Sequence, residues 1–132
     1  MNNIFKILTL SLLINQTLFA VTNSVQKRET QNIVLNNGYN AVLTSNQPLI
    51  KGKNNLDIVI LKNNRFVKNA DVNVVFSLPT MPNLEFSSHA KEKDNKYNLI
   101  VNFKEIGEWE YELMFKTTYG AIYSHAGRII VN

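Results

Sequence analysis

The chain has 132 residues, which suits a single domain, and its 14 basic and 10 acidic residues give a formal net charge of +4. The basic residues are interleaved with acidic ones and do not form the cluster typical of a nucleic-acid surface, so we expect no nucleic-acid partner. The sequence contains no cysteine, which excludes disulfides, thiolate metal sites and cysteine nucleophiles. The hydrophobic core must therefore hold the fold by itself.

The first twenty residues have the pattern of a secretory signal peptide. Lys6 supplies a short basic start, residues 7–14 are an apolar stretch, and residues 18–20 end in the small side chain that a cleavage site needs. The apolar stretch is too short for a membrane span, and an uncleaved anchor is the alternative. We predict a signal peptide at residues 1–20, no stable membrane span after cleavage, and a periplasmic or secreted protein.

The rest of the chain divides into a polar segment and a domain rich in predicted strands. Residues 21–36 predict a flexible lead-in, with a first short strand proposed at residues 33–35, and residues 37–132 predict the domain. Alternating segments separated by turn signals predict strands at residues 39–44, 56–61, 70–76, 84–92, 97–103, 109–116 and 121–131. About seven to eight short strands without helical periodicity favour an all-β fold, an immunoglobulin-like antiparallel β-sandwich, with a small barrel as the alternative.

The clearest alternation lies at residues 97–116, on either side of Gly107. Apolar and polar side chains follow one another with a period of two, which places one face of each strand in the core and the other in water. We expect five aromatic residues to anchor the core between the sheets. They are Phe76, Phe86, Phe103, Trp109 and Tyr111.

No catalytic arrangement is recognisable in the sequence. There is no nucleophile elbow and no phosphate-binding loop, and the two histidines are not accompanied by a serine in a typical turn. The carboxylates Glu108, Glu110 and Glu112 repeat with the strand period, which is typical of a solvated sheet face. We therefore expect a protein that is not an enzyme.

Four side chains are candidate metal ligands of the soft kind that Cu(I) prefers: Met81, His89, Met114 and His125. Met81 stands in a predicted loop between Pro79 and Pro82, whereas Met114 and His89 have the outward parity of their strands. Their spacing matches no metal-binding motif, and ordinary surface or core packing is the competing interpretation.

The domain resembles the YtkA-like family, which is close to the FixH-like domains. The resemblance rests on PLIKGKNNLDIVI at residues 48–60, ADVNVVF at 70–76, MPNL at 81–84 and YNLIVNFKEIGEWEYEL at 97–113. It implies an exported bacterial β-sandwich of the kind that accompanies copper and heavy-metal efflux or copper delivery to respiratory oxidases. Family members often carry a second methionine after the Met-Pro pair, where this chain has Leu84.

Two hypotheses about function follow. The first is a periplasmic accessory protein that binds copper or another heavy metal beside an efflux complex, with Met81 as a ligand and His89, Met114 or His125 completing the site. The second is a metal-independent interaction module, with residues 79–83 as the contact loop, or a FixH-like factor for oxidase assembly. The corresponding partners are a heavy-metal efflux complex or a respiratory oxidase assembly factor.

Overall fold

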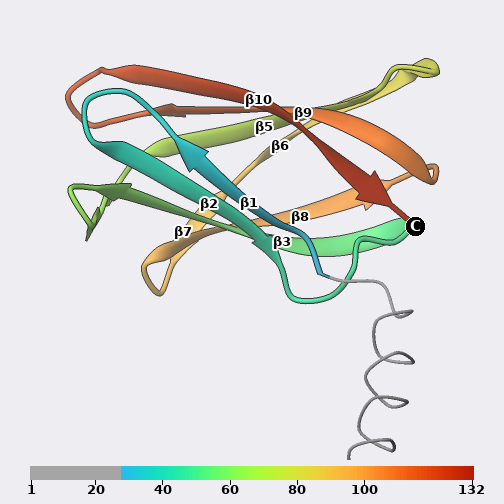
Figure 1. Ribbon diagram of the computed structural model, residues 1–132, viewed down its shortest axis with the longest axis horizontal. Helices are drawn as coiled ribbons and strands as arrows, with labels where there is room; N and C mark the ends of the chain where they lie inside the picture. Colours follow the sequence, from blue (N-terminus) through green and yellow to red (C-terminus); the bar gives the residue numbers. More distant parts are fainter. Residues whose placement is uncertain (1–27) are drawn as a thin grey trace, which may run out of the picture.

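The computed structural model describes residues 28–132, so the predicted signal peptide and the first part of the predicted lead-in lie outside the described residues. Ten strands follow one another (Figure 1): β1 (Thr30–Val34), β2 (Tyr39–Ser45), β3 (Gly52–Lys62), β4 (Arg65–Phe66), β5 (Asp71–Leu78), β6 (Met81–His89), β7 (Lys91–Lys93), β8 (Lys96–Phe103), β9 (Gly107–Lys116) and β10 (Ile122–Val131).

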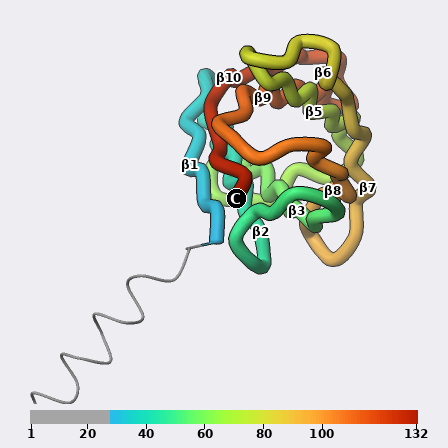
Figure 2. The backbone as a smooth tube through the Cα atoms, turned by 90° about the vertical axis from the view of Figure 1, so that its right-hand side faces the viewer, coloured from blue at the N-terminus to red at the C-terminus, as the bar shows by residue number. Residues whose placement is uncertain are grey.

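The strands form two antiparallel sheets that face each other (Figure 2). One sheet has the order β1-β2-β3-β8-β7, with β4 paired to β3, and we call it sheet A. The other has the order β10-β9-β5-β6, and we call it sheet B. The predicted all-β antiparallel sandwich is thus confirmed. Within residues 28–132 there is no helix long and apolar enough to cross a membrane.

Two differences from the predicted strand boundaries concern how the sheets are built. The strand expected at residues 84–92 is divided at Ala90, where the chain leaves sheet B and continues in sheet A. The segment expected as a flexible lead-in contains β1, which pairs with β2 over its full length. A polar sequence can form this strand because β2 satisfies its backbone, while Ile33 is its one fully buried side chain.

Three tight turns contain consecutive residues with positive φ, the backbone geometry that matches the twist of a β-hairpin. They are Asn37-Gly38 between β1 and β2, Asn63-Asn64 between β3 and β4, and Asp94-Asn95 between β7 and β8. Asparagine, aspartate and glycine tolerate this region better than other residues. The turn signals of the sequence therefore determine which strands form hairpins.

An aromatic cluster joins the two sheets. Trp109 of sheet B is fully buried and lies 5.2 Å from the Phe103 ring of sheet A, centroid to centroid. Phe76 contacts Phe103 edge to face at 5.3 Å, and the partly buried Phe86 packs against Phe76, Phe103 and Trp109. The Trp109 indole Nε1 donates a hydrogen bond to the Glu105 carbonyl at 3.0 Å. The predicted aromatic core is confirmed.

At one side of the sandwich, the edge strands β1 and β10 lie side by side (Figures 1 and 2). Tyr111 reaches from β9 under β10, and its hydroxyl donates to Gln31 Oε1 of β1 at 3.5 Å. The ring fits because residue 127 is glycine: an added Cβ would lie 2.6 Å from the Tyr111 hydroxyl oxygen. Burial raises the pKa of Tyr111 above its ordinary value, and the nearby charge of Glu29 raises it further.

We expect Trp109→Ala to lower the free energy of unfolding by about 3–5 kcal/mol, because it removes a fully buried aromatic side chain that contacts both sheets. Urea unfolding followed by circular dichroism measures the change. Ile130→Ala is the control, since this side chain lies on the exposed face of β10. A loss no larger than that of Ile130→Ala would contradict the assigned core.

We expect the free energy of unfolding to fall as the pH rises above about 10, in part because of Tyr111. The folded state keeps the phenol proton at a pH where the unfolded chain has lost it, so this contribution is complete below pH 10 and is lost as the pH passes the folded-state pKa. Burial also raises the pKa of Tyr97, which acts in the same direction.

Tyr111→Phe should therefore make the alkaline fall shallower without abolishing it. Urea unfolding at several pH values between about 8 and 11 measures the slope. The control is Tyr119→Phe, at a side chain that is almost wholly exposed. Equal slopes for wild type and Tyr111→Phe would show that folding does not raise the pKa of Tyr111.

Candidate functional site

The outer face of sheet B carries two of the predicted metal ligands in one cross-strand row. His89 on β6 pairs with Asn73 on β5, and Asn73 pairs with Met114 on β9. Alternation along each strand turns these side chains away from the core, because their neighbours Val72, Val74 and Leu113 are buried. His89 and Met114 thus point outward, as their positions in the alternating pattern predicted.

One strand separates the two ligands. Neighbouring strands lie about 4.8 Å apart, so the Cα atoms of His89 and Met114 are roughly 10 Å from each other across β5. Both side chains are long and point to the same side of the sheet, and Met114 is 36% exposed. Asn73 of β5 lies between them in this row.

The His89 ring has a carboxylate partner. Its Nε2 lies 2.7 Å from Oδ1 of Asp71 on β5, and the amide Nδ2 of Asn73 donates to the same oxygen at 3.3 Å. The side chains of His89 and Asp71 are 61% and 60% exposed, so water reaches the pair freely. Asp71 was not among the predicted site residues, because only the pairing of β5 with β6 brings it beside a histidine 18 positions away.

Met81 lies at the opposite end of β6 from His89. His89 follows Met81 by eight positions along the extended strand, a span of roughly 26 Å, so the two side chains do not share a site in one molecule. The Met-Pro segment expected as a loop is mostly strand: Leu78 pairs with Met81, and only Pro79 and Thr80 form the turn. β6 accommodates Pro82 because it is an edge strand.

His125 faces the other way from Met114. It pairs with the buried Leu113, is half-buried, and packs its ring against Tyr111 with 6.1 Å between centroids. It lines a groove of about 690 Å³ between the end of β1 and the start of β10, together with Asn37. The four predicted ligands therefore lie in three separate regions of the sandwich. Of the four, His89 and Met114 alone lie in one cross-strand row.

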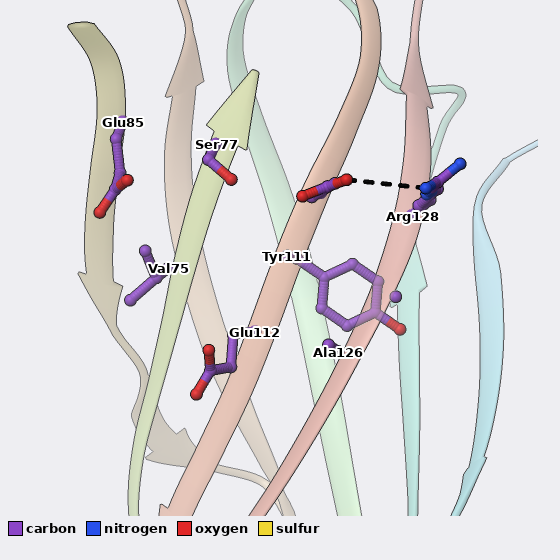
Figure 3. A pocket seen from close by; sticks show the side chains of 9 residues that line it. Val75, Ser77, Glu85, Tyr111, Glu112, Ala126 and Arg128 are labelled. Atoms are coloured by element: carbon purple, nitrogen blue, oxygen red, sulfur yellow. Dashed lines mark ion pairs between the residues drawn. The ribbon is translucent and has the colours of Figure 1, made fainter. Parts of the chain in front are cut away.

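A shallow hollow of about 440 Å³ lies beside this row on the outer face of sheet B (Figure 3). Small and charged side chains line it: Val75, Ser77, Glu85, Glu110, Glu112, Ala126 and Arg128. Arg128 pairs with Glu108 at 3.1 Å and with Glu110 at 3.7 Å. The carboxylates expected on a solvated sheet face are there, and among the residues that the structure describes, no three histidine or acidic side chains gather into a metal cluster.

Comparisons with known structures and families agree with this fold. The chain is similar to the structure of a copper-bound variant of FetP from uropathogenic Escherichia coli. The TM-score is 0.58 and the identity 8%, covering 78% of this chain and 96% of FetP. FetP as isolated after expression in the periplasm gives a TM-score of 0.56 and 8% identity, covering 79% of this chain and 95% of that one. At this identity the likeness concerns the fold.

Sequence comparisons identify the family more directly. A search of curated proteins gave no match. The model of the YtkA-like family matches residues 34–114, more than half of the chain, and this range contains β2 to β8 and most of β9. The protein belongs to the YtkA-like family.

Proposed function

We propose that this protein is a periplasmic accessory protein that binds copper as Cu(I), with His89 and Met114 as the ligands on the outer face of sheet B. The observation that carries the proposal is their position in one row of the sheet, on the same face and separated only by Asn73. The copper ion is cargo in this proposal, held for transfer to another protein.

The donor set suits Cu(I) better than harder ions. A thioether and an imidazole are ligands that Cu(I) accepts in a low coordination number, whereas Zn²⁺ in a structural site takes four nitrogen, sulfur or carboxylate donors. Met114 is 36% exposed on this face, so its thioether sulfur is accessible to an ion. Glu112 and Lys116, each two residues from Met114 on the same face, carry opposite charges, so the preference for Cu(I) rests on the donor atoms.

The comparisons support the same assignment. The FetP structures that share the fold include a copper-bound form and a form expressed in the periplasm. Membership of the YtkA-like family agrees with an exported protein associated with copper or heavy-metal resistance. Export depends on the predicted signal peptide at residues 1–20.

A binding role is proposed instead of an enzymatic one. In the part of the chain that the structure describes, the His89 ring bonds to Asp71, and no serine or threonine hydroxyl bonds to that ring. The corresponding partner would be a heavy-metal efflux complex or an assembly factor of a respiratory oxidase, to which the exposed row gives direct access.

We expect His89→Ala and Met114→Leu each to weaken Cu(I) binding by about tenfold or more, because each removes one of two ligands. Met114→Leu keeps a side chain of similar volume, so the fold should be retained. An anaerobic titration of the purified protein against a competing Cu(I) chelator measures the affinity.

Met81→Leu and His125→Ala are the matched controls and should bind Cu(I) as the wild type does, because these side chains lie at the far end of β6 and on the inner side of β10. A loss of binding in Met81→Leu alone would move the site to the β5–β6 hairpin. A wild type that binds no Cu(I) would refute the proposed function.

The exposed edge of the sandwich favours a second candidate, a metal-independent interaction module. Val34 at the end of β1 and Ile122 at the start of β10 are 84% and 68% exposed, and both belong to edge strands, which readily pair with an added strand. Capture experiments from periplasmic extract, with Cu(I) or with a chelator, separate the two functions. The copper proposal expects capture of a partner by the wild type to depend on Cu(I) and to be lost in His89→Ala.

A further inference from the structure

We propose that Asp71 is a positioning residue for the metal: it holds Nε2 of His89 and thereby leaves Nδ1 as the nitrogen that binds Cu(I). This inference rests on the proposed function and adds to it the assignment of one ring nitrogen and of one residue that does not touch the ion. The observation behind it is the 2.7 Å contact between Nε2 of His89 and Oδ1 of Asp71.

The assignment follows from the donors and acceptors of the two groups. A neutral imidazole has one N–H donor and one acceptor nitrogen, and an ionised carboxylate can only accept. The proton of the neutral ring therefore lies on Nε2, where it is donated to Asp71. Nδ1 keeps its lone pair, which a metal ion requires. Ligating histidines commonly donate their other N–H to a carboxylate in this way, which fixes the tautomer and makes the ligand more basic.

The surroundings hold Asp71 in this role. The amide of Asn73 donates to the same carboxylate oxygen at 3.3 Å, so the Asn73 side chain is directed along β5 toward Asp71. Lys116 on β9 is the cross-strand neighbour of Asp71, which places a positive side chain next to the carboxylate on its other side. Asp71 thus has the histidine and the amide as hydrogen-bond partners and a lysine as its cross-strand neighbour.

The competing interpretation is a plain surface ion pair. Exposed pairs contribute little to stability, and Arg128 with Glu108 is an example on the same face, at 3.1 Å and with 68% and 55% exposed side chains. If the His89–Asp71 contact were of that kind, copper would be free to take Nε2, and Asp71 would compete with the ion. The two interpretations predict different ring nitrogens and opposite effects of removing the carboxylate.

The experiment is NMR of the protein labelled with ¹⁵N-histidine, first without metal and then with one equivalent of Cu(I) under anaerobic conditions. Without metal, at a pH where the ring is neutral, we expect the proton of His89 on Nε2. With Cu(I), we expect the signal of Nδ1 to shift. Asp71→Ala should weaken Cu(I) binding by about 10–100-fold, while the matched variant Glu108→Ala binds like the wild type.

Three results would overturn the proposal: a metal-free ring with its proton on Nδ1, a Cu(I)-induced shift of Nε2, or Asp71→Ala binding Cu(I) as well as or better than the wild type. In each case a wild type that still binds Cu(I) through His89 leaves the proposed function intact. If the wild type binds no Cu(I) at all, the proposed function fails and the role of Asp71 fails with it. The metal-free measurement needs no variant, so it stands even if Asp71→Ala does not fold.

Discussion

The fold depends on the aromatic contacts between the two sheets around Trp109. This side chain is fully buried, and its neighbours Phe103 and Phe86 come from opposite sheets. Without cysteines, no disulfide can replace these contacts. Because the inner positions of β5 and β9 are occupied by the core, every second residue of these strands must face water. The outer face of sheet B is thus one of the surfaces that the core leaves free for binding.

This division of the strands explains where functional residues can stand. Met114 and His125 lie on neighbouring strands, next to each other in the cross-strand register, yet the sheet separates them because their parity differs. His89 and Met114 come from strands that do not touch, yet they share a face. Met114 lies on the internal strand β9, whereas His89 lies at the end of the edge strand β6, which is held by its pairing with β5.

The proposed copper site is small and open, in keeping with a protein that would hand its ion to a partner. Two protein ligands leave coordination positions for a third donor from outside, and both side chains are accessible to such a donor. A closed four-ligand site would hold the ion more firmly and release it more slowly. The acidic residues on the same face would favour the approach of a cation or of a positively charged partner surface.

The amino-acid sequence by itself determined the class of fold, the faces of the strands and the turns. Period-two alternation assigned Trp109 and Tyr111 to the core and Met114 to the surface, since parity depends only on local backbone geometry. The tertiary structure decided which strands are neighbours, because register and sheet order arise from contacts between distant segments. That order placed Asp71 beside His89 and separated Met81 from every other predicted ligand. It also allowed a polar segment to form β1, because β2 provides hydrogen-bond partners for its backbone.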